Sequence, residues 1–358
     1  MKNQKKFSSS LLLWNTTENK RQMPWKGEKD PYRIWISEII LQQTRVQQGL
    51  DYYNRFIYAF PDVKSLAMES EKKVYKLWEG LGYYTRCKNL IATAKFIHEN
   101  LNGKFPERYE EILSLKGIGT YTASAIASFA FNQPYAVLDG NVFRVLSRFF
   151  GKEIPVNTTE GKKFYAALSQ ILLDKKNPAK YNQAIMDFGA IVCKPLLPLC
   201  LECPLKKECI AFLKNKVAEL PVNNKIIKQK ERFFNYFIVE NNNHVYVNKR
   251  IEKDIWQNLY EFILIETEAW KNENEILQNE NFLKLINKSP FTVKRISKKI
   301  AQKLTHQIIN GRFIHVEIEK PLATKKYFAA KKEQLETLPF SKFIASYLTD
   351  KNVSLNPI

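Results

Sequence analysis

The spacing of apolar residues predicts helices along the first two-thirds of the chain. Apolar side chains recur every three or four residues, the period of an amphipathic helix, in the segments 7–19, 51–59, 70–79, 85–100, 120–131, 160–173 and 179–192. One further stretch, 32–48, carries apolar side chains on more than one face. We expect this helix to be buried and to begin after Asp30, because Pro31 suits the first helical position.

The pattern changes after residue 232. Residues 233–250 predict two strands joined by an Asn-rich turn, and 313–318 predict another strand, with helices near 272–286 and 341–348. The polar, basic stretch 215–232 that precedes them is typical of a linker. We therefore expect a mostly α-helical domain over 1–214 and a smaller α+β domain over 233–358.

Glu38 lies inside the apolar helix of 32–48, in the run YRIWISEIILQQTRVQQ. A carboxyl group in such surroundings loses solvation, which raises its pKa and makes it a proton donor. A solvated helix face is the commoner place for a glutamate. This helix, however, offers little polar surface before Gln42, so the sequence favours a desolvated acid.

A tight turn and a second helix start organise residues 113–145. Gly117-Ile118-Gly119 predicts a turn that excludes a Cβ at both glycines, and the helix from Thr120 leaves its first N–H groups free to bind a phosphate. Asp139 opens another helix, where an aspartate most often serves only as an N-cap. Each feature alone is weak, since most Gly-x-Gly turns merely reverse the chain. Together they resemble the layout of helix-hairpin-helix DNA repair enzymes.

The charge of the chain favours a polyanionic partner. The 358 residues contain 56 Lys and Arg against 36 Asp and Glu, a formal net charge of +20. A Lys- and Asn-rich composition can also reflect the base content of a genome, so charge alone does not identify nucleic acid. The apolar run 11–14 is too short for a signal peptide, and no stretch has the length of a membrane span. We expect a cytoplasmic protein without a membrane partner.

Four of the five cysteines lie close together and predict a metal site. Cys193, Cys200, Cys203 and Cys209 form the spacing C-x6-C-x2-C-x5-C, and thiolates on one loop can bind zinc or an iron–sulfur cluster. A reducing compartment disfavours disulfides. Structural zinc more often uses two Cys-x-x-Cys pairs, so the single pair with long outer spacers favours one [4Fe–4S] cluster on the loop 193–209.

Taken in order, the motifs of the chain resemble those of the A/G-specific adenine DNA glycosylases of the MutY family, within the endonuclease III-like superfamily. The matching stretches are MPWK (23–26), SEIILQQTRV (37–46), WEGLGYYTR (78–86), LKGIGTYTASAI (115–126), VLDGNVFRV (137–145), NQAIMDFGAIVC (182–193), the cysteine loop and KRIEKDIWQNLYEF (249–262). They cover nearly the whole chain. The resemblance implies a base-excision repair hydrolase that removes adenine mispaired with 8-oxoguanine or guanine in double-stranded DNA, acting as a monomer.

The resemblance also implies roles for the catalytic residues. Glu38 corresponds to the acid that protonates the adenine ring, and Asp139 to the carboxylate that stabilises the positively charged sugar. Asn141 would orient Asp139. Bifunctional members of the superfamily carry a lysine where this chain has Tyr121, and that lysine cleaves the strand through a Schiff base. Tyr121 has no such chemistry, so we expect a monofunctional enzyme without lyase activity, in which Tyr121 hydrogen-bonds near the sugar.

The same resemblance assigns contacts to DNA. An enzyme acting on a paired adenine must flip it out of the stack. The family's positions near the stack fall on Gln43, Thr44 and Tyr83, those near the flipped base on Lys26, Leu41 and Asp187, and those on a phosphate on Gly117 and Gly119. The loop 80–84 could present Tyr83 as an aromatic wedge, and a core or surface tyrosine is an equally simple alternative.

The C-terminal part resembles the Nudix-like domain that recognises 8-oxoguanine in this family. The Arg-Glu-x-x-Glu-Glu magnesium helix of working Nudix hydrolases is missing, so we expect binding without hydrolysis. Leu304-Thr305-His306 stands where the family usually has Phe-Ser-His; Thr305 keeps the hydroxyl and His306 is retained, but the aromatic residue is lost. Gln257-Asn258 replaces the usual glycine pair after the tryptophan.

Three other functions are compatible with parts of the pattern. An endonuclease III-like bifunctional glycosylase for oxidised pyrimidines is disfavoured by Tyr121 and by the extra C-terminal domain. A non-catalytic iron–sulfur DNA-binding protein is disfavoured by the paired carboxylates Glu38 and Asp139. A nucleotide pyrophosphohydrolase would need the metal-binding carboxylates that the C-terminal domain lacks.

Overall fold

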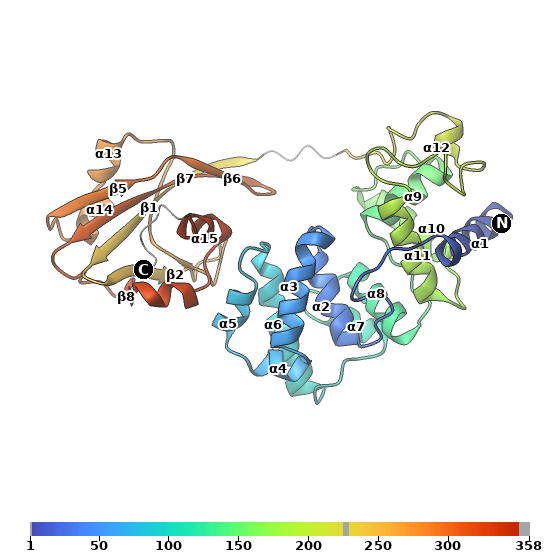
Figure 1. The fold of residues 1–358 in the computed structure, drawn as a ribbon, viewed down its shortest axis with the longest axis horizontal. Helices are drawn as coiled ribbons and strands as arrows, with labels where there is room; N and C mark the ends of the chain where they lie inside the picture. The colour runs from blue at the N-terminus through green and yellow to red at the C-terminus, as the bar shows by residue number, and fades with distance from the viewer. Residues whose placement is uncertain (1, 225–228, 351–358) are drawn as a thin grey trace. The chain divides into compact units, whose positions relative to one another are not determined.

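The computed structural model of the protein describes residues 2–224 and 229–350. The chain forms two compact units (Figure 1). The first comprises Met1–Met68 and Asn89–Lys225, and the second comprises Glu69–Lys88 and Ile226–Ile358. Residues 225–228 of the predicted linker lie outside the described part. Within the described ranges, none of the helices combines the length and the hydrophobicity of a membrane span.

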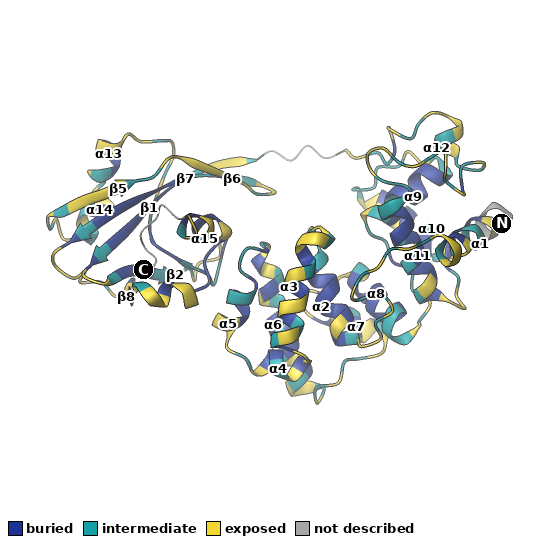
Figure 2. Cartoon of the chain, in the orientation of Figure 1, coloured by how far each residue is buried: buried dark blue, intermediate teal, exposed yellow. Residues whose placement is uncertain are grey.

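The first unit is built from helices, as the periodicity predicts. Its helices are α1 (Lys2–Thr17), α2 (Pro31–Leu41), α3 (Val46–Ala59), α4 (Val63–Met68), most of α6 (Tyr84–Asn100), α7 (Tyr109–Ser114), α8 (Thr120–Phe131), α9 (Gly140–Phe150), α10 (Thr159–Leu172), α11 (Pro178–Ile191) and α12 (Ile210–Leu213). A core of buried side chains, among them Trp14, Val142, Tyr165 and Phe188, joins α1, α9, α10 and α11. The apolar residues of these helices are buried, and Figure 2 colours the buried positions dark blue.

Helix α2 is buried as expected, but the predicted continuation to residue 48 is wrong. Asp30 caps the helix by accepting a hydrogen bond from the N–H of Tyr32, and Pro31 occupies its first turn. The helix ends at Leu41, and Gln43 has a left-handed backbone with φ of 57°. The polar residues after Leu41 have no apolar face to bury, so they form a loop before α3.

Of the two glycines in the hairpin between α7 and α8, only one occupies a position that excludes other residues. Gly117 has φ of 80°, and a Cβ there would lie 2.6 Å from the side chain of Asn89. Gly119 has φ of −96° and open space around the same position, so the prediction that it excludes a Cβ is wrong. No side chain caps the start of α8.

The second unit contains a mixed sheet. Its strands are β1 (Lys230–Asn241), β2 (His244–Lys249), β3 (Tyr260–Glu261), β4 (Ile263–Thr267), β5 (Phe291–Ile296), β6 (Ile300–Lys303), β7 (Gln307–Ile318) and β8 (Phe328–Lys331). The order β3-β2-β1-β7-β5 places the parallel pair β1 and β7 at the centre, and the remaining pairs are antiparallel. The predicted strands in 233–250 and 313–318 are confirmed, whereas the short, largely exposed strands β5, β6 and β8 were not predicted.

Helices flank this sheet. They are α13 (Glu273–Leu277), α14 (Glu280–Leu285) and α15 (Lys342–Leu348), with a 3-10 turn at Lys332–Thr337, and α5 (Glu71–Leu77) belongs to the same unit. Phe237 and Ile314 from the central strands pack with Phe282 of α14 in a core of their own. The α+β character predicted for the C-terminal part is therefore observed as a mixed-sheet α/β domain.

Candidate active site

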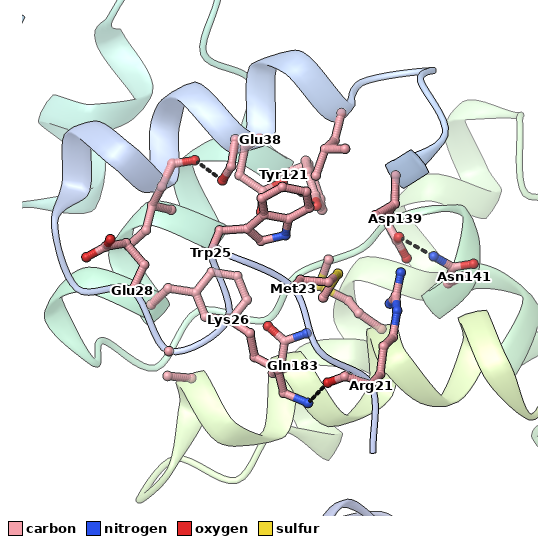
Figure 3. A pocket seen from close by; sticks show the side chains of 18 of the residues that line it. Arg21, Met23, Trp25, Lys26, Glu28, Glu38, Tyr121, Asp139, Asn141 and Gln183 are labelled. Carbon is pink, nitrogen blue, oxygen red and sulfur yellow. Dashed lines mark hydrogen bonds between the residues drawn. The ribbon is translucent and has the colours of Figure 1, made fainter. Parts of the chain in front are cut away.

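One cavity of about 790 Å³ in the first unit collects all the predicted catalytic residues and several of those predicted to meet DNA. It lies between α2, α8, the start of α9 and α11, with the segment 21–29 along one side (Figure 3). Its lining includes Glu38, Tyr121, Asp139 and Asn141, together with Lys26, Leu41, Gln43 and Thr44. Apolar and polar side chains both line it, and its volume is in the range of a small-ligand site.

The side chain of Glu38 lies in the cavity wall, in surroundings that disfavour its ionised form. The residue is only 7% exposed, because α2 is apolar around it. Burial raises its pKa, a hydrogen bond from Tyr121 opposes the rise and the charge of Asp139 adds to it, so that the pKa is about 7. The Tyr121 hydroxyl, on the first turn of α8, donates to Oε2 of Glu38 at 2.6 Å. The raised pKa that the apolar surroundings predict is therefore observed, and it leaves a substantial protonated fraction of Glu38 near neutral pH.

Asp139 serves as the N-cap of α9 and also faces the cavity. Its Oδ1 accepts from the N–H of Val142 at 2.8 Å, and its Oδ2 accepts from Nδ2 of Asn141 at 2.8 Å. Burial raises its pKa, while these two hydrogen bonds and the charge of Arg144 lower it. The capping role is compatible with the catalytic role predicted for Asp139, because each oxygen keeps a second lone pair.

Asn141 is fixed from behind by Arg144 and by the close approach of α11. Nη2 of Arg144 donates to Oδ1 of Asn141 and to the carbonyl oxygen of Gly189, both at 2.8 Å. Nε of Arg144 donates to the carbonyl oxygen of Cys193 at 2.8 Å. A Cβ on Gly189 would lie 2.6 Å from Cβ of Asn141. Glycine at this position therefore lets α11 pack directly against the residue that orients Asp139.

Asp187 lies behind the cavity wall and not in it. Its side chain is fully buried and accepts hydrogen bonds from Nδ2 of Asn19 at 2.8 Å, Nη1 of Arg21 at 2.7 Å and Nε2 of Gln183 at 3.0 Å. Nζ of Lys26 lies 3.2 Å from its other oxygen. With these donors around it, Asp187 positions Arg21, Lys26 and Gln183, which line the cavity. Asp187 itself is not among the residues that line the cavity, and its contact with a flipped base stays a prediction.

Comparison with known proteins shows to which family the chain belongs. Residues 36–163 match the HhH-GPD superfamily of base excision DNA repair proteins. The adenine DNA glycosylase of Buchnera aphidicola subsp. Acyrthosiphon pisum is 38% identical over 273 residues, 76% of each chain. That of Buchnera aphidicola subsp. Baizongia pistaciae is 35% identical over 318 residues, 88% of this chain and 87% of the relative. The chain belongs to the adenine DNA glycosylase family.

Solved structures agree with the fold of the helical part. A thermostable thymine-DNA glycosylase, 29% identical, covers 60% of this chain and 98% of its own with a TM-score of 0.55. An endonuclease III in a non-covalent complex with DNA, 19% identical, superposes with a TM-score of 0.51 and shares the fold. The predictions of a helix-hairpin-helix glycosylase fold and of a DNA N-glycosylase are therefore confirmed.

Sequence reasoning missed several residues that line the cavity of this adenine DNA glycosylase. They are Arg21, Met23, Trp25, Gln183 and Met186, of which Figure 3 labels the first four. A signal for Gln183 was present, since it lies one helical turn before Asp187 on the helix predicted over 179–192. Arg21 gave no such signal, because it lies in the irregular segment between α1 and α2.

The remaining predicted site residues of the glycosylase lie away from this cavity. Gly117 and Gly119 are in the hairpin before α8. Tyr83, Thr305 and His306 belong to the second unit, and all three are exposed. The predicted catalytic residues therefore belong to the first unit, whereas Tyr83 and the residues predicted to read 8-oxoguanine belong to the second.

The four clustered cysteines of the glycosylase line a separate hollow beside α9 and α12. Nη1 of Arg148, on α9, lies 3.6 Å from Sγ of Cys193, and it donates to the carbonyl oxygen of Lys194 at 2.7 Å. Over residues 2–224 and 229–350, no three His, Cys, Asp or Glu side chains are close enough to hold a single metal ion. The four cysteines thus line one hollow, and the metal group that the spacing predicts stays a prediction.

Proposed function

We propose that this adenine DNA glycosylase flips out an adenine mispaired with 8-oxoguanine or guanine and hydrolyses its N-glycosidic bond without cutting the strand. The observation that carries this proposal is the pair of carboxyl groups in one cavity with different environments. Glu38 is buried and has a pKa of about 7, whereas Asp139 is held by an N–H group and an amide that favour its charged form. Two carboxyl groups with separated roles are what glycosidic cleavage requires.

The mechanism follows from these environments. Protonated Glu38 donates its proton to a ring nitrogen of adenine, so that the base leaves with the electron pair of the glycosidic bond. The carboxylate of Asp139 stabilises the positive charge left on the sugar, either through space or by a transient bond to its anomeric carbon. A water molecule then adds to that carbon and gives its proton to the carboxylate of Glu38, which restores the acid. Asn141 and Arg144 keep Asp139 oriented throughout.

Tyr121 determines what the enzyme leaves behind. A strand-cleaving glycosylase needs an amine that forms a Schiff base with the sugar. Tyr121 offers a phenol, and the burial that raises its pKa well above its ordinary range keeps this phenol protonated. The product is therefore an intact strand with an abasic site.

The DNA contacts and the reading of the opposite base complete the proposal. The uncapped start of α8 and the open space at Gly119 suit a DNA phosphate. Gln43 and Thr44, in the loop after α2, would meet the stack, as would Tyr83. The second unit would act as the Nudix-like reader of 8-oxoguanine through Thr305 and His306, which are exposed between β6 and β7.

The cysteine loop fits one [4Fe–4S] cluster. Cys193, Cys200, Cys203 and Cys209 line one hollow and would supply the four thiolates that such a cluster needs. Structural zinc more often uses two Cys-x-x-Cys pairs, and this loop has one such pair with long outer spacers. The cluster would stabilise the loop and its surface toward DNA. The expectations of a monomer and of a cytoplasmic location stay predictions.

The decisive experiment uses a duplex with one adenine opposite 8-oxoguanine and a matched A·T duplex. Strand breakage that requires hot alkali, and that occurs only in the mispaired duplex, is the expected result. Breakage without alkali would mean lyase activity and contradict the role given to Tyr121. Glu38→Gln should retain DNA binding and lose base removal. Adenine release by this variant at the wild-type rate would contradict the acid assignment.

A further inference from the structure

The cavity of the first unit extends well beyond the two carboxyl groups. On α8 its lining includes Tyr121 in the first turn and Phe129 near the end, which lie about 12 Å apart along the helix axis at a rise of about 1.5 Å per residue. On α11 it includes Ala179, Gln183 and Met186, which share one face of that helix. The cavity therefore follows both helices away from the reacting groups, and its volume of about 790 Å³ is more than one purine base fills.

Exposed residues line this cavity at both of its ends. At the end that contains Glu38 and Asp139, Gln43 and Gly140 are exposed. At the other end, which we call the far mouth, the exposed lining residues lie just before α2, just after α8 and at the start of α11, and they are Lys29, Asn132, Asn177 and Lys180. The cavity is thus open to solvent at two places, with partly buried side chains between them.

The segment 21–29 forms a fixed wall between these two ends. Nζ of Lys26 lies 3.2 Å from a carboxylate oxygen of the buried Asp187. At the far mouth, Nζ of Lys29 donates to the carbonyl oxygen of Phe129, in the last turn of α8, at 2.9 Å. The segment is therefore held at both ends of the cavity, and the passage along α8 and α11 does not depend on its movement.

Bound DNA would close one of the two openings. In the proposed reaction the adenine enters while it is still joined to its sugar, and the sugar must lie beside Asp139. After cleavage the base lies deeper in the cavity than the abasic sugar, which still fills the entrance. The base must then either wait until the DNA dissociates or leave through the far mouth.

Resting on the proposed function, we propose that the far mouth is the exit of the free adenine, which leaves along α8 and α11 while the abasic strand stays bound. Because Glu38 has given its proton to the base, the adenine leaves as a neutral, planar molecule. Its faces suit the partly buried side chains of Phe129 and Met186. Its polar edges suit the amides of Gln183 and Asn177, which line the same passage.

The test follows a single turnover of a duplex whose radiolabelled adenine lies opposite 8-oxoguanine. Alkali-induced breakage after a chemical quench gives the rate of bond cleavage, and label that passes a filter retaining the enzyme–DNA complex gives the rate of base release. In the wild-type enzyme the two time courses should coincide while the abasic strand stays on the filter. Ala179→Trp narrows the far mouth and should slow release roughly tenfold or more relative to cleavage, so that release becomes the limiting step.

Two further variants make the result specific. Lys180→Trp obstructs the same mouth and should also separate the two time courses, whereas Ala167→Trp adds the same bulk at an exposed position of α10 outside the lining and should leave them coincident. The inference would be overturned, with the proposed function intact, if the wild-type enzyme kept the adenine until the DNA dissociated. Coincident time courses in Ala179→Trp, or an equal delay of release in Ala167→Trp, would overturn it as well. A wild-type reaction without alkali-induced breakage would instead contradict the proposed function itself.

Discussion

The hydroxyl of Tyr121 and Oε2 of Glu38 are 2.6 Å apart, joining the first turn of α8 to the interior of α2. This hydrogen bond acts directly on the carboxyl group that we propose as the acid. Burial drives the pKa of Glu38 upward, and the phenol limits the rise by stabilising the carboxylate. In the proposed mechanism, the tyrosine that stands in place of a lyase amine therefore also tunes the proton donor.

This tuning predicts the pH dependence of base removal. Because Glu38 must be protonated to act and its pKa is about 7, the single-turnover rate should fall as the pH rises through about 7. In Tyr121→Phe the stabilising hydrogen bond is lost, so the pKa of Glu38 should rise and the fall in rate should move to higher pH. Rates on the 8-oxoguanine duplex between pH 5.5 and 9 measure both. A shift to lower pH in this variant would contradict the coupling.

The same burial means that ionised Glu38 lowers the free energy of unfolding. Its pKa is raised above its ordinary value of 4.5, so the folded state binds more protons than the unfolded state between pH 4.5 and 7. Stability is therefore lost as the pH rises through this window, by about 3 kcal/mol. Glu38→Gln should raise the Tm at pH 8 and change it little at pH 4.5. Equal shifts at the two pH values would mean that the substitution acts through packing alone.

The helical part of the fold was predictable because amphipathic periodicity is a local property. Glu38 was found in the same way, since the apolar neighbours that desolvate it are within its own helix. The end of α2 at Leu41 could not be predicted, because one turn of polar residues is compatible with a solvated helix as well as with a loop. The assignment of segment 69–88 to the second unit depends on what the helix packs against, which periodicity does not report.

The site was predictable where chemistry coincides with a local signal and not where it depends on tertiary contact. Asp139 stands at a recognisable helix start, but the bond between Tyr121 and Glu38 joins residues 83 positions apart. The burial of Asp187 behind Arg21 and Lys26 likewise arises only when α11 packs against the segment before α2. The parallel pairing of β1 and β7 is a further long-range choice that alternation of side chains leaves open.

Gly189 tests the support of Asn141. Gly189→Ala places a Cβ 2.6 Å from Cβ of Asn141 and 3.1 Å from its carbonyl oxygen, so Asn141 or α11 must shift. We expect a loss of about 1–3 kcal/mol in the free energy of unfolding and at least a tenfold lower single-turnover rate, because Asp139 loses its orientation. Gly140→Ala is the control for stability, since nothing lies within 4 Å of the added carbon. Wild-type activity in Gly189→Ala would show that Asn141 tolerates displacement.

Substitution of Asp187 tests whether this buried side chain positions the residues that line the cavity. Asp187→Asn leaves Arg21 and Lys26 facing a neutral group in a buried place, which should cost about 3 kcal/mol in the free energy of unfolding. The dissociation constant for the mispaired duplex should rise more than the rate of base removal falls. Glu280→Gln, which removes an exposed partner of Lys284, is the matched control and should have no measurable effect. A drop in rate with unchanged binding would instead favour direct action of Asp187 on the base.

The identity of the metal group can be decided by counting atoms. The purified glycosylase should contain about four irons and an equal amount of acid-labile sulfide per chain, as a [4Fe–4S] cluster requires. Cys203→Ser removes one thiolate from the hollow that the four cysteines line, and should lower the iron content and destabilise the loop 193–209. Cys87→Ala is the matched control, since Cys87 is buried in the second unit and outside that hollow, and its variant should keep its iron. One zinc per chain in the wild-type protein would contradict the cluster and indicate a single zinc ion. An equal loss of iron from both variants would contradict the assignment of the clustered cysteines as the ligands.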